Sequence, residues 1–144
     1  MSTFPTPGAR GRSPEALLAP VQSFLGAPRI GVLSSLNADQ TPYQVVVHYL
    51  PAGDHLLVNG SAHRRWVRNL RRDGHVALLV LDGDDTLHWV GIRGIAGPPT
   101  EGPGAVDDAK RIAVRYGEDP SEYEGLQRVS YRITPRHVYE YAQR

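Results

Sequence analysis

The stretch from Asn59 to Asp73 reads Asn-Gly-Ser-Ala-His-Arg-Arg-Trp-Val-Arg-Asn-Leu-Arg-Arg-Asp. At about 100° of rotation per residue, a helix through it places Trp66, Val67 and Leu70 on one side. Asn69 falls at the border of that side. The arginines gather on the opposite arc, so the stretch predicts a helix with one apolar and one cationic face. The residues of the cationic face are Arg64, Arg65, Arg68, Arg71 and Arg72.

The start of this predicted helix has an unusual charge. Ser61 is expected to be the N-cap, yet His63, Arg64 and Arg65 follow, where the positive end of the helix dipole favours acidic side chains. Free backbone N–H groups together with added arginines form a natural site for an anion such as phosphate. The alternative is a solvated surface helix whose arginines keep the protein soluble. The residues alone leave both interpretations open.

Length and composition limit the class of protein. The 144 residues predict a single domain over residues 14–144, behind a flexible segment at residues 1–13. A net charge of +1 makes the cationic helix a local feature, unlike the general basicity of nonspecific nucleic-acid binders. The absence of cysteine excludes disulfides, thiolate nucleophiles and cysteine-type zinc sites. We find no signal-peptide core and no membrane-length apolar run, and therefore expect a soluble, cytoplasmic protein without a membrane partner.

The first half of the chain predicts a helix and then three strands. Ser13-Pro14-Glu15 is typical of a helix start, Gly26 of its end, and Pro20 should shorten or kink the helix between them. Apolar and β-branched runs predict strands that pair as an antiparallel meander. These strands are expected at residues 29–36, 42–50 and 55–59.

The second half predicts further strands around one helix. Strands are expected at residues 75–81 and 86–96, then a helix at 105–116, then strands at 127–133 and 136–141 with a bend or bulge at Pro135. The acidic turn at 82–85 lacks the distal glutamate and other ligands of a calcium loop, so we expect a hairpin turn and no metal. The fold class is therefore mainly β (α+β). We expect a six- to seven-stranded antiparallel sheet with flanking helices, closed into a small barrel that has no edges.

Conventional catalytic motifs are missing. The sequence has no phosphate-binding glycine loop, no His-Glu-x-x-His and no Gly-x-Ser-x-Gly. Its histidines show no paired ligand spacing on one helix. A chain of this kind can still be an enzyme if a bound cofactor carries the chemistry and the protein orients it.

The order of these segments resembles a known family. The chain is similar to pyridoxamine 5'-phosphate oxidase-like split β-barrels in four successive segments. These are a strand ending in Asn-Gly-Ser, the run Arg-x-x-x-x-Asn-Leu-x-Arg-Asp at 64–73, an apolar strand, and Ser-Tyr-Arg-Ile-Thr-Pro-Arg-His-Val at 130–138. The closest resemblance, over residues 29–141, is to the flavin and deazaflavin-dependent oxidoreductases of actinobacteria. It implies a homodimer with cofactor sites at the subunit interface.

The resemblance also implies a cofactor, either FMN or coenzyme F420. We expect reduced F420 to transfer a hydride to a small-molecule substrate with an electron-poor C=C, C=N or ring. The alternatives are an FMN-binding reductase or oxidase of the same fold, and a non-catalytic cofactor-binding protein. A nucleic-acid partner is not expected, because Trp66 points away from the arginines and no row of exposed aromatics is present for base stacking.

The cationic face distinguishes the two cofactors. FMN ends in one phosphate, for which Arg64, Arg65 and the helix N-terminus suffice. Coenzyme F420 continues into a tail of carboxylates, which needs further charge. Arg68, Arg71 and Arg72 offer that charge on the same arc with no other evident use, so we expect F420.

The resemblance assigns site residues by position. One departure is Trp66, where many members carry a phosphate-binding lysine, so Arg64 or Arg65 must supply the missing charge. His48 and Tyr49 are candidate proton donors, with the alternative that they only line the barrel mouth. The ring is expected against Val46, Val47 and His48, the phosphate near Asn59, Gly60, Ser61, Arg64 and Arg65 with Asn69 close by, and the second subunit's contacts from Trp89 and Arg93.

Overall fold

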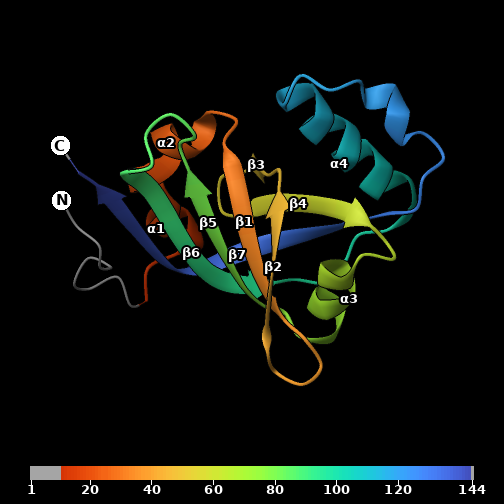
Figure 1. The fold of residues 1–144 in the computed structure, drawn as a ribbon, viewed down its shortest axis with the longest axis horizontal. Coiled ribbons are helices and arrows are strands. Elements are labelled where there is room, and N and C mark those ends of the chain that lie inside the picture. The colour runs from red at the N-terminus through yellow and green to blue at the C-terminus, as the bar shows by residue number, and fades with distance from the viewer. Residues whose placement is uncertain (1–10, 144) are drawn as a thin grey trace.

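The computed structural model describes residues 11–143, and a single antiparallel sheet dominates it (Figure 1). Seven strands pair in the order β2-β1-β5-β6-β7-β4-β3. The mainly β fold with flanking helices is therefore confirmed. The strands are β1 (Ile30–Leu36), β2 (Pro42–Val47), β3 (Leu50–Pro51), β4 (Leu56–Ser61), β5 (His75–Leu81), β6 (His88–Ala96) and β7 (Arg128–Ala142).

Helices flank this sheet on several sides. Figure 1 shows α3 and α4 on the side of β2 and β4, and α1 and α2 toward the other end. No helix within residues 11–143 is long and apolar enough to cross a membrane. The α-helices are α1 (Pro14–Leu18), α2 (Gln22–Gly26), α3 (Arg65–Arg72) and α4 (Gly102–Arg115), and the 3-10 turns are η1 (Ala19–Val21) and η2 (Pro120–Tyr123).

The sheet curls into a half-barrel that stays open. The predicted meander of the first three strands is wrong, because β4 pairs with β7 and β3, and not with β2. The expected closure without edges is also wrong, since β2 and β3 each have one hydrogen-bonded neighbour. The break falls at Tyr49, whose N–H donates to Tyr116 Oη (3.3 Å) and not to a strand. The two edge strands are thus joined only by the chain at His48 and Tyr49.

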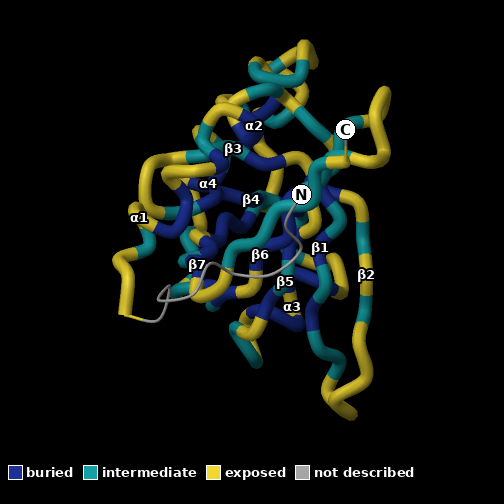
Figure 2. The backbone as a smooth tube through the Cα atoms, turned by 90° about the vertical axis from the view of Figure 1, so that its left-hand side faces the viewer, coloured by how far each residue is buried: buried dark blue, intermediate teal, exposed yellow. Residues whose placement is uncertain are grey.

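The core lies on the concave side of the curled sheet, under the helices. Alternation along the strands turns one face inward, and Leu33, Val80 and Val90 on that face are fully buried. Leu25 from α2 and Val67 from α3 complete this core. Figure 2 shows the contrast with β2, which is mostly exposed or half-buried along its length.

The N-terminal helix forms as the sequence predicts. Ser13 caps α1, its Oγ accepting a hydrogen bond from the N–H of Ala16 (3.2 Å). Pro20 lies in η1, which separates α1 from α2, so the predicted interruption is confirmed. The rest of the predicted flexible segment, residues 1–10, lies outside the described residues.

Helix α3 has the predicted faces but starts later. Trp66, Val67 and Leu70 are buried, and the arginines of the cationic face are exposed. The predicted N-cap Ser61 is wrong, because Ser61 is the last residue of β4 and pairs with Arg128. The N-cap position is taken by Arg64, whose side chain makes no capping hydrogen bond.

Strand β7 is continuous and contains a bulge. Its register against β6 jumps from Arg93↔His137 to Gly94↔Pro135, so Arg136 has no partner. The bulge predicted at Pro135 is confirmed, and the two predicted strands are one. Gly94 is required opposite it, because a Cβ there would collide with the carbonyl oxygen of Thr134.

Candidate functional site

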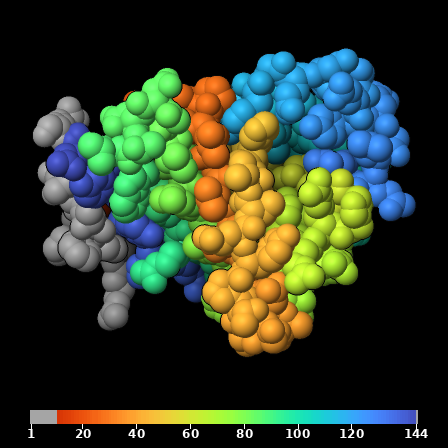
Figure 3. Space-filling model, in the orientation of Figure 1, coloured from red at the N-terminus to blue at the C-terminus, as the bar shows by residue number. Residues whose placement is uncertain are grey.

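A cavity of about 370 Å³ lies between β2, β4, α4 and the start of α3. In the space-filling view of Figure 3, the gold β2 segment, the yellow-green α3 segment and the light-blue α4 segment border the same part of the surface. The cavity brings together most residues that the sequence assigned to a cofactor. These are Val46, Val47, His48, Asn59, Gly60, Ser61 and Arg64.

One wall of this cavity is formed by β2. Val46 is 65% exposed, although it is a large apolar residue. At the end of this wall, the ring of His48 stacks on Tyr116, with the ring centroids 3.8 Å apart and the planes 4° from parallel. His48 Nδ1 lies 3.6 Å from Glu118 Oε1. Two contacts therefore fix the orientation of the imidazole beside the cavity.

The opposite part of the cavity is cationic. Arg128, from the start of β7, donates from Nε to Asn59 Oδ1 (2.8 Å) and from Nη1 to Ser61 Oγ (3.1 Å). Its guanidinium also lies 4.9 Å from the centre of the Tyr123 ring. Burial lowers the pKa of Arg128, and the nearby charge of Arg64 acts in the same direction. Two positive groups therefore approach each other around a partly dry space.

Neither arginine is neutralised within residues 11–143. None of the ion pairs there includes Arg64 or Arg128. Glu118, the carboxylate that lines the cavity, lies against His48. Like charges in a low-dielectric site repel unless an anion joins them. The geometry is that of an anion-binding site.

Asn59 supports this site and does not face it freely. Its Nδ2 donates to the carbonyl of Ala105 (2.8 Å) and to Ser130 Oγ (2.9 Å), and its Oδ1 accepts from Arg128. The amide therefore ties β4 to α4 and β7, and it holds the guanidinium of Arg128 in position. Both N–H donors of the amide and one lone pair of Oδ1 are therefore used by protein groups.

Gly60 and Trp66 form the floor of the cavity. A Cβ at Gly60 would lie 2.5 Å from Cζ2 of the Trp66 indole, so only glycine lets the ring pack against the strand. Trp66 is 4% exposed, as its helix face predicts. The indole thus packs beside the strand at the position where many family members carry a phosphate-binding lysine. A cation from a distant part of the chain, Arg128, lines the cavity instead.

Arg128 is the cationic site residue that sequence reasoning missed, together with Glu118 and Tyr123 of the same cavity. It enters the site because Ser61 pairs with it across the β4–β7 ladder, and strand register over such a distance is not visible in a pattern of residues. A weak signal exists, since Arg128 stands at the start of a predicted strand, directly before Val129.

Arg65 and Asn69 do not reach the cavity, in contrast to the prediction. Arg65 lies with Arg68 and Arg72 in a separate groove between α3 and the turn at 37–39. Asn69 is buried, and its Nδ2 donates to Ser35 Oγ and Asn37 Oδ1, both at 3.1 Å. Its role in this structure is to fasten α3 to the β1–β2 hairpin.

The remaining arginines of α3 are not all free. Arg71 forms an ion pair with Glu101. Arg72 donates to the carbonyl of Leu36 (2.6 Å) and to Asn69 Oδ1 (3.0 Å). The expectation that both lack another use is wrong, because Arg71 ties α3 to Glu101 in the loop before α4 and Arg72 ties α3 to the end of β1.

Trp89 and Arg93 lie on β6, on the outer face of the sheet. Trp89 stacks on Tyr141, with centroids 5.2 Å apart and planes 6° from parallel. Neither residue lines the cavity of its own chain. Their predicted contact with a cofactor across a dimer stays a prediction.

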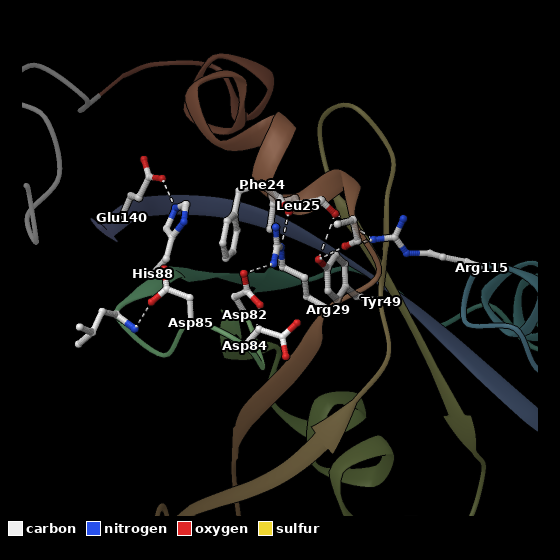
Figure 4. A network of polar contacts seen from close by, with 12 residues as sticks. Phe24, Leu25, Arg29, Tyr49, Asp82, Asp84, Asp85, His88, Arg115 and Glu140 are labelled. Atoms are coloured by element: carbon white, nitrogen blue, oxygen red, sulfur yellow. Dashed lines mark hydrogen bonds and ion pairs between the residues drawn. The ribbon is translucent and has the colours of Figure 1, made fainter. Parts of the chain in front are cut away.

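Tyr49 belongs to a structural network and not to the cavity (Figure 4). It is fully buried, and its hydroxyl donates toward the carbonyls of Leu25 (3.0 Å) and Ala27 (3.1 Å). Burial raises its pKa to about 12. The hydroxyl points into the core, so Tyr49 is corrected from a candidate proton donor to a core residue, whereas His48 remains beside the cavity.

The same network contains Arg115 of α4. Its Nη2 donates to the carbonyls of Leu25 and Ala27, both at 2.9 Å, and its Nη1 to that of Gly26 (3.1 Å). These carbonyls end α2, where a cation is favourable. Arg115 thereby fastens α4, which covers the cavity, to the N-terminal helices.

The acidic turn at 82–85 is also occupied by protein contacts (Figure 4). Asp82 Oδ1 accepts from the N–H of Asp84, and its other oxygen pairs with Arg29 (3.1 Å). Asp85 accepts from the N–H of Leu87. The hairpin turn predicted for this segment is therefore confirmed.

Comparison with known proteins defines the family. Residues 17–142 match the family model of pyridoxamine 5'-phosphate oxidase, so the chain belongs to this family, whose members bind flavin-type cofactors. No curated protein matches the chain in sequence.

Solved structures share the fold. An F420 reductase has a TM-score of 0.74 and 23% identity, covering 81% of this chain and 94% of its own. A conserved hypothetical protein from Mycobacterium tuberculosis has a TM-score of 0.72 and 24% identity, and the match covers 86% of this chain and 83% of that protein. HutZ, the heme storage protein from Vibrio cholerae, has a TM-score of 0.69 and 15% identity, and the match covers 88% of this chain and 96% of that protein.

Proposed function

We propose that the protein is an oxidoreductase that uses reduced coenzyme F420 to transfer a hydride to a small electron-poor C=C, C=N or ring substrate. One observation carries the proposal. Arg64 and Arg128 converge without a carboxylate at one part of a cavity whose other wall is apolar. This arrangement fits a ligand that joins a planar ring to a phosphate. When bound, the reduced cofactor supplies the hydride.

The protein's own residues bind and orient the cofactor and exclude water from it. Arg64, Arg128 and the Ser61 hydroxyl hold the phosphate. Val45 and Val47 share one face of β2 and provide an apolar surface for the ring, because apolar contact removes water from both partners, and Val46 borders the cavity from the other face of the strand. His48 stands at the end of this wall, where its stacked and paired imidazole limits how a substrate lies.

The groove next to the cavity favours F420 over FMN. Arg65, Arg68 and Arg72 line it, directly after Arg64 in the chain. FMN has one phosphate and no use for this charge. The carboxylate tail of F420 would follow the groove, with weak contacts of ~0 to 1 kcal/mol each that salt screens.

We propose in addition that the protein is a homodimer with the cofactor at the subunit interface. Val46, Val32 and Leu79 are directly paired across three strands and point to the outer face. Val46 and Leu79 are 65% and 37% exposed. A second copy on this apolar row would also cover the cavity, because Val46 belongs to both. Light scattering tests the dimer, and a monomer with bound cofactor would contradict it.

The experiment that tests the function is a pair of titrations. Coenzyme F420 and FMN are added to the protein at low and high salt, and binding is followed by fluorescence quenching. We expect F420 to bind more tightly and its affinity to fall with salt. Arg68→Ala should reduce that salt dependence, whereas Arg111→Ala, an exposed arginine of α4 paired with Asp108, serves as the matched control. Tight FMN binding that ignores Arg68→Ala would favour the flavin alternative.

Turnover separates an enzyme from a storage protein. Reduced F420 is mixed with the protein and a panel of quinones, activated alkenes and imines, and its reoxidation is followed by absorbance. We expect at least one class to accelerate reoxidation above the rate without protein. Tight binding with no acceleration across the panel would instead support a non-catalytic cofactor-binding protein.

A further inference from the structure

A second cavity, of about 410 Å³, opens on the outer face of the sheet and shares no lining residue with the first. Its position follows from the strand registers. Ser34, Ala77, Arg93 and His137 are directly paired from β1 through β5 and β6 to β7. Residues paired in this way point to the same face. We call this cavity the outer notch.

Small side chains form the floor of the outer notch, and long ones form its rim. Ser34 and Ala77 leave the β1–β5 half of the row low, while the longer side chains of Arg93 and His137 stand on the β6–β7 half. All four lie on hydrogen-bonded strands, with Arg93 and His137 next to the bulge of β7, so their backbone positions are set by the sheet. The notch is therefore a built feature of the sheet and not a gap between loops.

The bulge in β7 adds a second arginine to the rim. In a regular strand, Arg136 and His137 would point to opposite faces. Because Arg136 is the extra residue of the bulge, both side chains are exposed and both line the notch. Bulges commonly redirect a side chain next to a functional site.

The charge of the outer notch is unbalanced. None of its lining residues is acidic. Within residues 11–143, neither Arg93 nor Arg136 takes part in an ion pair, and the nearby Asp73 is occupied by His75 at 2.7 Å. Cations on neighbouring strands repel one another. In a protein of net charge +1, this concentration of positive charge calls for an anion.

We propose that the outer notch is a second anion-binding site, which takes the carboxylate or phosphate group of a small molecule. Arg93 and Arg136 bind the oxyanion through charge-assisted hydrogen bonds. His137 and Ser34 contribute further polar contacts, since an imidazole N–H and a hydroxyl both donate to oxygen. The proposal gives Arg93 an anion of its own in place of the contact with a cofactor across a dimer that the family resemblance implies, so it does not depend on the cofactor assigned to the first cavity.

The test is an NMR titration of the ¹⁵N-labelled protein in its native assembly, with inorganic phosphate in one series and malonate in another. We expect saturable shifts at the amides of Ala77, Arg93 and His137. Tighter binding of phosphate identifies a phosphate-bearing ligand, and tighter binding of malonate identifies a carboxylate-bearing one. Shifts that never saturate, or that occur only at the amides of 60–64, would overturn the proposal.

Matched variants locate the binding. Arg136→Ala should weaken the anion by about tenfold, the scale of one lost charge-assisted hydrogen bond. Arg132→Ala removes the same charge from an exposed position on the same strand that lines neither cavity, and should leave the affinity unchanged. If Arg136→Ala disturbs the bulge, Arg93→Ala tests the site independently and should also weaken anion binding. Equal affinity in all of these variants would refute the site.

A variant of the first cavity keeps the two proposals separate. Arg64→Ala combined with Arg128→Met should leave anion binding at the outer notch unchanged. If the double change removes the shifts at Ala77 and Arg93, the outer notch is not an independent site. Failure of cofactor binding in the wild type, by contrast, has no effect on this measurement.

Discussion

Within residues 11–143, Arg115 and Arg128 are both partly buried arginines without an ion pair, but their surroundings differ. The two Nη atoms of Arg115 donate to three main-chain carbonyls at the end of α2, whereas its buried Nε has no partner within residues 11–143. Arg128 uses Nε and Nη1 on Asn59 and Ser61, and meets a second cation, Arg64, in an open cavity. The difference shows how to separate a structural arginine from a ligand-binding one. A structural arginine such as Arg115 donates to main-chain carbonyls at the end of a helix. A ligand-binding arginine such as Arg128 points its charge into a cavity.

The largest expected effect tests the support beneath the cavity. Trp66→Ala removes the indole that packs against Gly60, and it should lower the free energy of unfolding by ~3–5 kcal/mol as a large core truncation. Denaturant titration measures the change. Arg68→Ala, on the exposed face of the same helix, is the control and should change stability by about 0.5 kcal/mol or less. Unchanged stability in Trp66→Ala would mean that the indole is not part of the core.

Arg128→Met tests the ligand-binding side of the comparison. Methionine keeps the length of the stem and removes the charge. We expect cofactor affinity to fall by ~2–3 kcal/mol, since a desolvated charge is lost from the phosphate. Calorimetric titration measures the affinity. If Arg128→Met unfolds more easily but binds the cofactor with normal affinity, Arg128 is a structural arginine like Arg115.

Arg115→Met tests the structural side with the same substitution. The carbonyls of Leu25, Gly26 and Ala27 lose a charged donor, so the free energy of unfolding should fall by about 2 kcal/mol. Cofactor affinity, measured in the folded range, should stay near the wild-type value. Weaker binding without loss of stability would reverse the assignment of the two arginines.

The smallest expected effect separates two neighbouring arginines. Arg64 lines the first cavity and Arg65 lines the groove beside it. Arg64→Ala should reduce cofactor affinity by ~1 kcal/mol, and Arg65→Ala by about 0.5 kcal/mol or less, because both are exposed. Titrations at low salt give the best resolution. Equal losses would show that the phosphate lies between the two side chains.

Local patterns in the sequence predicted the local parts of this protein. The period of α3 separates Trp66, Val67 and Leu70 from the arginines because periodicity reports which side chains turn inward. The same reasoning failed at Ser61, since the strand pairing of Ser61 with Arg128, 67 residues later, overrides its tendency to cap a helix.

The candidate site divides in the same way. The residues around β2 and the β4–α3 junction were named from the sequence, with help from the family resemblance. Arg128 was missed, and Asn69 was placed at the cofactor, because both depend on contacts between distant segments. Asn69 meets Ser35 only when α3 lies against β1, and no local pattern records that contact.

The pairing of β4 with β7 also determines when the protein can assemble its site. Strands β1, β2, β5 and β6 pair with close neighbours in the chain and can form early, because closing short loops loses little entropy. Strand β4 must wait for β7, since Asn59 and Ser130 are 71 residues apart. During synthesis on the ribosome, Arg128 is made after the apolar wall that it faces, and we expect that wall to fold first. We therefore expect the anion-binding end of the cavity to form last.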